Sequence, residues 1–204
     1  MIDIYHAPGT RSLRVIWLCE ELRLPHRVIP VDFSPEYRAS AEWRKKNPVG
    51  KVPVLVDGDL TLFESGAMVQ YLLDRYGEGR LQPARGTPEH ALYLQWSWFA
   101  EATFARPLGE IVNHRRAIPE AQQSQTAIEE MQARAWLCVE AIDRALEGRS
   151  YLLGAEFTAA DIMTGYTLML ADRFLPQRLP PRVAEYWADL AARPACAAAL
   201  SHDH

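Results

Sequence analysis

The sequence of 204 residues predicts an α/β domain followed by an all-α domain. Strand-like and helix-like segments alternate through residues 1–76, which is the pattern of an α/β unit. Residues 77–87 lack any hydrophobic period and are rich in glycine and proline, so they are predicted to be a linker. Residues 88–204 contain helical periodicity and no convincing strand pattern.

The first domain is predicted to have the order β-α-β-α-β-β-α. Its first strand–helix–strand implies a parallel strand pair with a right-handed crossover. Asp57 and Gly58 between two apolar runs predict a hairpin. The elements preceding that hairpin are a strand at 2–5, a helix at 13–22, a strand at 26–31 and a short irregular helix within 35–47, and a last helix begins near residue 65.

The second domain is predicted to be a helical bundle. One long helix carries Leu92, Trp96 and Phe99. A second is marked by apolar residues from Ile128 to Leu146 and is expected to start at Pro119. Thr158 and Asp161 form a capping-box pattern that begins another helix, flanked by a hydrophobic staple of Phe157 and Ile162. Residues 182–193 and 194–200 are expected to be short final helices.

Composition excludes several classes of function. The net charge is −4 and no basic run is present, so neither nucleic acid nor a membrane surface is an expected partner. No apolar stretch is long enough to span a bilayer. Three widely spaced cysteines favour a reduced, cytoplasmic setting. The six histidines lack metal-ligand spacing, so no metal is expected, and His202 and His204 are interpreted as solvated.

The segment from Pro48 to Ser65 predicts a peptide-binding ledge. Pro53 cannot donate to a sheet ladder, so it belongs at a strand start or edge, and it holds Val52 extended. If the Val52–Pro53 bond is cis, the backbone N–H and C=O of Val52 point outward and can pair with a peptide as an added strand. Only about 5–6% of X–Pro bonds are cis, so composition alone does not establish that geometry.

Glu64 and Ser65 stand where the hairpin ends and a helix begins. A serine at a helix N-terminus offers a hydroxyl and free N–H groups to an anion such as a carboxylate. The alternative is that Ser65 only caps its own helix, which is the commonest use of serine at such a place.

Thr10 and Ser12 offer hydroxyls between the first strand and the first helix, a favoured ligand position in α/β units. Either could simply cap the helix. A serine nucleophile with His6 as its base is disfavoured, because no G-x-S-x-G elbow or acid partner accompanies it. A thioredoxin-type redox role needs cysteines in this turn, and none is present. A hydroxyl that donates to the thiolate of a ligand fits better.

Together these motifs resemble the cytosolic glutathione S-transferases over essentially the full chain. The motifs are Pro8 to Val15, Lys51-Val52-Pro53, Glu64-Ser65 and the all-α second half. The resemblance implies a thioredoxin-like first domain, a cis proline and glutathione as co-substrate. It also implies that Val52 holds the cysteinyl part, that Glu64 and Ser65 hold the γ-glutamyl end, and that Lys51 lies near the glycyl end.

The Thr-Arg-Ser stretch is similar to the serine-type lineages and to fungal or bacterial ones, in which Thr10 aligns best with the thiol-facing hydroxyl and Ser12 is the runner-up. The beta-like pattern has a cysteine where this chain has Arg11, and the zeta-like Ser-Ser-Cys run is absent. The resemblance further implies a homodimer in which Glu101 of the partner helps to bind glutathione. Phe104 and Arg106 are the candidate wall of a second-substrate site, whereas Trp96 and Phe99 are expected in the core.

Two function classes follow from this resemblance. The first is a detoxifying transferase that adds the glutathione thiolate to an apolar electrophile or reduces a hydroperoxide. The alternative is a non-catalytic binding or interaction module of the same fold, against which the intact Val52-Pro53 and Glu64-Ser65 motifs argue. A disulfide reductase is a weaker third option, opposed by the lack of a cysteine in the first turn.

Overall fold

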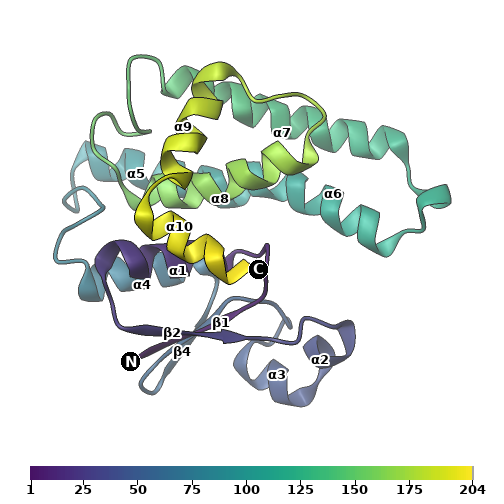
Figure 1. Ribbon diagram of the computed structural model, residues 1–204, viewed down its shortest axis with the longest axis horizontal. Coiled ribbons are helices and arrows are strands. Elements are labelled where there is room, and N and C mark those ends of the chain that lie inside the picture. The colour runs from purple at the N-terminus through teal and green to yellow at the C-terminus, as the bar shows by residue number, and fades with distance from the viewer. Residues whose placement is uncertain (204) are drawn as a thin grey trace. The chain divides into compact units, whose positions relative to one another are not determined.

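The computed structural model describes residues 1–203, which form two compact units (Figure 1). Unit 1 is Met1–Leu81 together with the C-terminal segment that begins at Ala192, and unit 2 is Gln82–Ala191. None of the described helices is long and apolar enough to cross a membrane.

Unit 1 is built on a four-stranded sheet in the order β2-β1-β3-β4. β1 (Ile2–His6) pairs in parallel with β2 (His26–Pro30), as the predicted crossover requires. β3 (Val54–Asp57) is antiparallel to β1 and forms the expected hairpin with β4 (Leu60–Phe63). This arrangement is the thioredoxin-like fold predicted for the first domain.

Helices α1 (Ser12–Leu22), α4 (Ser65–Tyr76) and α10 (Pro194–Leu200) lie on one side of this sheet (Figure 1). α1 is buried on nearly all sides because α4 and α10 both pack against it. An ion pair between Arg193 and Glu21, with an Nε–Oε1 distance of 2.6 Å, also ties the C-terminal segment to α1. The sequence placed this segment in the all-α domain, whereas in the structure it completes unit 1.

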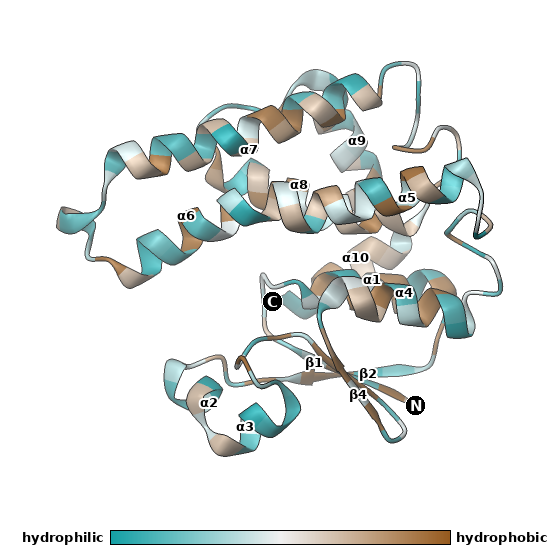
Figure 2. Ribbon diagram, turned by 180° about the vertical axis from the view of Figure 1, so that it is seen from behind, coloured by the Kyte–Doolittle hydropathy of each residue, from teal (hydrophilic) through white to brown (hydrophobic). Residues whose placement is uncertain are grey.

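A second hydrophobic cluster of unit 1 centres on Trp43 of α3 (Ala41–Lys46), which follows the short α2 (Pro35–Ala39). Trp43 packs with Ala7, Val52 and Val54 and is flanked by the ring of Tyr5. Figure 2 shows the strands at the centre of unit 1 as largely hydrophobic and α3 as largely hydrophilic. The side of α3 that carries Trp43 therefore packs against the segment that contains Val52.

Unit 2 is entirely helical in its described residues apart from turns and one isolated bridge. The predicted long helix is divided into α5 (Pro88–Trp98), a π-helical segment (Phe99–Phe104) and α6 (Ala105–Ala117). The later α-helices of unit 2 are α7 (Gln125–Ala145), α8 (Ala159–Phe174) and α9 (Pro181–Ala191). The predicted helix start at Pro119 is wrong, since α7 begins after the cap residue Ser124.

The capping box before α8 is confirmed. The Asp161 carboxylate accepts hydrogen bonds from the backbone N–H groups of Thr158 (2.8 Å) and Leu152 (3.1 Å) and from the hydroxyl of Tyr186 (2.6 Å). Burial raises the pKa of Asp161, and these donors oppose that rise. The cluster fixes the start of α8 and joins it to α9.

Candidate functional site

The hydroxyls of Thr10 and Ser12 form a continuous hydrogen-bonded chain with His6 at the N-terminus of α1. Thr10 Oγ1 donates to the carbonyl of Ala7 at 2.7 Å and lies 2.7 Å from Ser12 Oγ. Ser12 Oγ lies 2.7 Å from Nδ1 of His6. Neither hydroxyl caps the helix, because the N-cap position belongs to Arg11 and has no side-chain cap. The capping alternative for Thr10 and Ser12 is therefore wrong.

The other side of the His6 ring faces the C-terminal segment. Nε2 lies 3.0 Å from the carbonyl oxygen of His202 and 3.5 Å from Oδ1 of Asp203. The side chain of His202 is exposed as expected, but its backbone is part of this contact. His204 lies outside the described residues. An acid thus lies beside His6 after all, supplied by residues far away in the sequence.

The Val52–Pro53 peptide bond is cis. The ladder between β1 and β3 ends at the Tyr5–Val54 pair, so Val52 lies beyond the last paired position of β3. Asn47 anchors the approach to this position, since its side chain donates to the carbonyl of Lys51 at 2.9 Å and accepts from the N–H of Val49 at 3.1 Å.

Gly50 makes the turn before Val52 possible. Its φ is +63°, and a Cβ there would collide with the carbonyl oxygen of Arg38. Only glycine meets both demands without strain. The chain around Val52 is therefore held by Asn47 and Gly50 before it and by the Trp43 cluster beneath it.

Glu64 and Ser65 occupy an unusual backbone position at the start of α4. Glu64 has φ 76° and ψ 106°, a region that side-chain-bearing residues rarely adopt, and such strain concentrates at functional sites. Glu64 is exposed, whereas Ser65 is 3% exposed and its hydroxyl accepts a hydrogen bond from the guanidinium of Arg14 at 3.3 Å. Ser65 is the first helical residue and not the cap, so the capping interpretation is wrong here too.

The residues predicted for a second-substrate wall lie in unit 2 and have opposite environments. Phe104 is 0% exposed and packs near the ring of Phe99, so the prediction that it lines an open site is wrong. Trp96 and Phe99, expected in the core, are only half-buried and contact each other edge to face. Arg106 is exposed and pairs with Glu110 at 3.0 Å.

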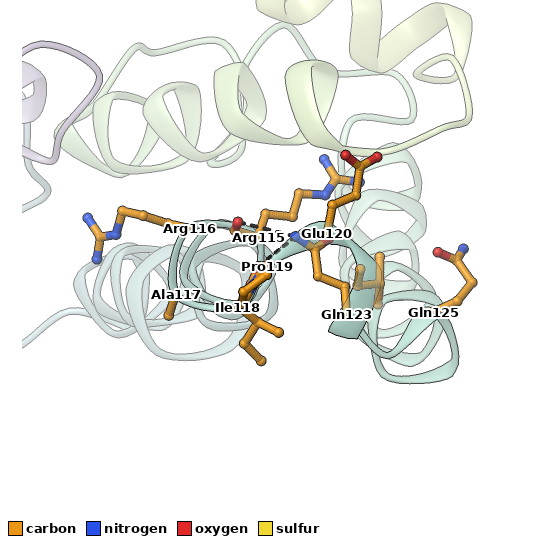
Figure 3. A pocket seen from close by; sticks show the side chains of 9 residues that line it. Arg115, Arg116, Ala117, Ile118, Pro119, Glu120, Gln123 and Gln125 are labelled. Carbon is orange, nitrogen blue, oxygen red and sulfur yellow. Dashed lines mark hydrogen bonds between the residues drawn. The ribbon is translucent and has the colours of Figure 1, made fainter.

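A shallow, open pocket lies at the turn between α6 and α7 of unit 2 (Figure 3). Gln123, one of the residues that line it, donates from its side chain to the carbonyls of Arg115 and Ile118. Arg115 and Glu120 extend to one side of it and Arg116 to the other (Figure 3), and its lining residues include no cysteine, serine or histidine. We therefore place the candidate site in unit 1.

The thiols of the protein are unsuited to redox chemistry. Cys19, Cys138 and Cys196 are all free and buried. Burial raises their pKa values to about 12, 11 and 12 respectively. A thiolate at neutral pH must therefore come from a ligand.

Comparison with known proteins agrees with this geometry. Residues 2–74 match the glutathione S-transferase N-terminal domain, and residues 125–200 match the glutathione S-transferase C-terminal domain. The chain is 28% identical to Glutathione S-transferase 3 of Schizosaccharomyces pombe, over 96% of this chain and 85% of that protein. It is 31% identical to Disulfide-bond oxidoreductase YfcG of Escherichia coli, over 79% of this chain and 76% of that protein.

Among solved structures, the glutathione transferase URE2P6 from Phanerochaete chrysosporium in complex with oxidized glutathione has a TM-score of 0.89 and 26% identity, over 99% of this chain and 96% of that one. The fold and these matches define a two-unit protein with a thioredoxin-like unit and a helical unit. The chain belongs to the glutathione S-transferase family, and it is an enzyme of that family.

Several residues of the site were not singled out by the sequence. Asn47 and Asp203 lie in no motif, and Arg14 lies within Pro8 to Val15 without a role of its own. Arg14 and Asp203 act through partners distant in the sequence, whereas Asn47 bonds to Val49 and Lys51 close by. The sequence indicates for His6 only the disfavoured role of a base for a serine nucleophile. A polar residue at a position whose neighbours are apolar, as Arg14 is within 13–19, is the one signal that could have found any of them.

Proposed function

We propose that the chain binds glutathione in unit 1 and stabilises its thiolate with the hydroxyl of Thr10. The observation that carries this proposal is the position of Thr10 at the partly exposed end of the buried Thr10–Ser12–His6 chain. A free thiol has a pKa near 8.5, so a donated hydrogen bond and the positive end of α1 increase its ionised fraction at neutral pH.

Exposure separates the two candidate hydroxyls. Ser12 is 0% exposed and its oxygen lies between Thr10 and His6, so a sulfur atom reaches it only by displacing Thr10. Thr10 is half-buried, and its hydroxyl proton goes to Ala7 in the structure. Rotation of that hydroxyl toward a bound sulfur exchanges one acceptor for another.

The rest of unit 1 supplies the matching contacts for the tripeptide. The backbone of Val52 would pair with the cysteinyl part as an added strand, and exposed Lys51 would meet the glycyl carboxylate. Ser65, the start of α4 and the charge of Arg14 would receive the γ-glutamyl carboxylate, while Glu64 would receive its amino group.

The thiolate would then attack an apolar electrophile, or the oxygen of a hydroperoxide. We propose a homodimer in a cytoplasmic setting, with Glu101 of the partner subunit contributing to the glutathione site. The alternative expected from the sequence, a non-catalytic module of the same fold, disagrees with the relatives named glutathione S-transferase, and only binding of glutathione without ionisation of its thiol would support it.

Substitution of the two hydroxyls tests the proposal. Thr10→Ala should lower kcat/KM with a chloronitrobenzene or cumene hydroperoxide about 10- to 100-fold, because a hydrogen bond to a charged group contributes about 1.5–3 kcal/mol. Thr10→Ser keeps the hydroxyl and should retain most activity. Ser12→Ala should lose less than Thr10→Ala. A larger loss in Ser12→Ala would show that Ser12 meets the sulfur, and full activity in both would refute a role for either hydroxyl.

Calorimetry tests the binding half separately. Glutathione should bind the wild-type protein, and Ser65→Ala should weaken binding about 5- to 20-fold by removing a carboxylate contact worth about 1–2 kcal/mol. Ser97→Ala in unit 2 removes a hydroxyl that donates to the Tyr93 carbonyl of its own helix, and it serves as the matched control. Absence of binding at millimolar glutathione would refute the proposal.

A second candidate activity is disulfide reduction, favoured by the 31% identical relative named a disulfide-bond oxidoreductase. The glutathione thiolate would attack one sulfur of a disulfide, forming a mixed disulfide and releasing the other sulfur as a thiolate that takes up a proton. A second glutathione thiolate would then attack the mixed disulfide, giving oxidised glutathione and the second free thiol. No protein cysteine is needed, which answers the objection raised by the missing cysteine in the first turn.

A further inference from the structure

The buried ring of His6 touches oxygen atoms at both nitrogens. The ring is 3% exposed, Nδ1 meets the hydroxyl of Ser12, and Nε2 meets the carbonyl of His202 and the carboxylate of Asp203. Oδ1 of Asp203 is buried and has no hydrogen-bond partner among the described residues other than this 3.5 Å approach. Every neighbour of Nε2 is thus an acceptor.

The direction of each hydrogen bond in the chain follows from counting protons. A carbonyl only accepts, so the Thr10 proton goes to Ala7. Ser12 must then donate across its 2.7 Å contact with Thr10, since Thr10 has no second proton. With the Ser12 proton committed, Nδ1 of His6 must donate to Ser12.

Both nitrogens of His6 therefore have to donate. Four contacts require four protons, whereas two hydroxyls and a neutral imidazole supply only three. A neutral ring would leave two oxygen atoms 2.7 Å apart with no proton between them. The charged ring satisfies all four contacts, and the nearby carboxylate of Asp203 compensates its charge.

We propose that His6 is a doubly protonated positioning residue, held by Asp203, that orients the hydroxyls of Ser12 and Thr10 toward the thiolate of glutathione. The role toward sulfur rests on the proposed function, whereas the charge of His6 does not. Two titratable groups lie beside the imidazole of His6 in the described residues. They are the carboxylate of Asp203 and the imidazole of His202, which lies edge-on with a centroid distance of 6.4 Å.

The charged ring makes Thr10 a stronger donor. When the Thr10 proton turns from Ala7 to a sulfur, Ser12 still donates to the Thr10 oxygen and His6 still donates to Ser12. Hydrogen bonds in such a chain polarise one another, so the last O–H in the chain is strengthened by the charge at its start. The arrangement also excludes a serine hydrolase, because a protonated histidine cannot accept the Ser12 proton and Ser12 is inaccessible.

Nitrogen NMR of the ¹⁵N-histidine-labelled full chain, without glutathione, tests the charge of His6. The signal absent in His6→Gln identifies the residue. Two protonated ring nitrogens are expected at neutral pH in the wild type, and a neutral fraction should appear in Asp203→Asn, a mild change beside a half-buried group. One unprotonated nitrogen in the wild type, or no response to Asp203→Asn, would overturn the proposal.

Ultraviolet titration of the bound glutathione thiol tests the positioning role. His6→Gln and Ser12→Ala should each reduce the thiolate fraction at neutral pH several-fold, and the double variant should lose no more than Ser12→Ala alone, because His6 acts through Ser12. Asp203→Asn should give a smaller loss and covers the case in which His6→Gln fails to fold.

The role of His6 and the transferase function are refuted by different results. Unchanged thiol ionisation in His6→Gln, or additive losses in the double variant, would overturn the role of His6 while leaving the transferase proposal intact. A wild-type protein that binds glutathione without ionising its thiol would instead refute the proposed function, and the NMR result would still decide the charge of His6.

Discussion

A buried polar cluster in unit 1 and another in unit 2 differ in where their hydrogen bonds end. In unit 2, the donors around Asp161 all converge on its carboxylate, and every partner is buried or part of the same turn. In unit 1, the chain from His6 through Ser12 ends at Thr10, which is partly exposed and can redirect its proton.

This difference separates a structural cluster from a functional one. The Asp161 cluster is closed, so its hydrogen bonds stabilise one conformation of the α8 start and have nothing to offer a ligand. The hydrogen bonds from His6 through Ser12 end at the partly exposed hydroxyl of Thr10. Transfer of the Thr10 proton from the Ala7 carbonyl to a ligand atom costs little free energy, because one acceptor replaces another. Substitutions at Asp161 and Thr10 test that contrast, and Asp57, a partly buried carboxylate of unit 1, gives an intermediate case.

Removal of the Asp161 carboxylate should have the largest effect on stability. Asp161→Ala leaves the Tyr186 hydroxyl and the N–H groups of Thr158 and Leu152 without their acceptor in a buried site. The free energy of unfolding should fall by about 3–5 kcal/mol, measured by urea denaturation. Asp161→Asn keeps the shape and should cost less, and a loss below about 1 kcal/mol in Asp161→Ala would contradict the closed-cluster interpretation.

Asp57 should have an intermediate and pH-dependent effect. Its carboxylate accepts from the hydroxyls of Tyr76 and Tyr71 and lies near Arg75, and the hydrogen bond from Tyr76 is the main cause that holds its pKa below the usual 3.8. Because the pKa is lower in the folded state, its stabilisation is present above about pH 4 and is lost as the pH falls through the folded-state pKa.

Asp57→Asn should therefore lower the free energy of unfolding by about 1–2 kcal/mol at neutral pH and flatten its decline in acid. Urea denaturation at a series of pH values measures both. Asp59→Asn, in the exposed turn of the same hairpin, is the control. If the free energy of unfolding of Asp57→Asn declined as steeply in acid as that of the wild type, the stabilising role of the Asp57 carboxylate would be contradicted.

Thr10→Ala should have the smallest effect on stability, although it has a large predicted effect on activity. The variant loses the hydrogen bond to the Ala7 carbonyl and the one from Ser12, but water can replace the hydroxyl at this partly exposed position, so the free energy of unfolding should fall by only about 0.5–1 kcal/mol. A destabilisation as large as that of Asp161→Ala would show that the Thr10 chain is structural and would remove the contrast between the two clusters.

Local sequence patterns were sufficient for much of the fold. The alternation through residues 1–76, the Asp57-Gly58 hairpin and the Thr158–Asp161 capping box depend on residues a few positions apart, and the structure confirms each. The long helix was harder, because Trp96 and Phe104 are both aromatic and only their packing shows that Phe104 is buried while Trp96 is half-buried.

Short-range backbone preferences and hydrophobic periods encode the two halves of the chain and the segments that carry Val52-Pro53, Glu64-Ser65 and Thr10 to Ser12, so these features could be predicted from residue order. The role of each hydroxyl, by contrast, follows from the three-dimensional packing. That packing places the C-terminal segment on α1, sets Asp203 beside His6 across nearly the whole chain length, and buries Ser12 behind Thr10. Such contacts depend on where distant elements meet, and no local pattern records that.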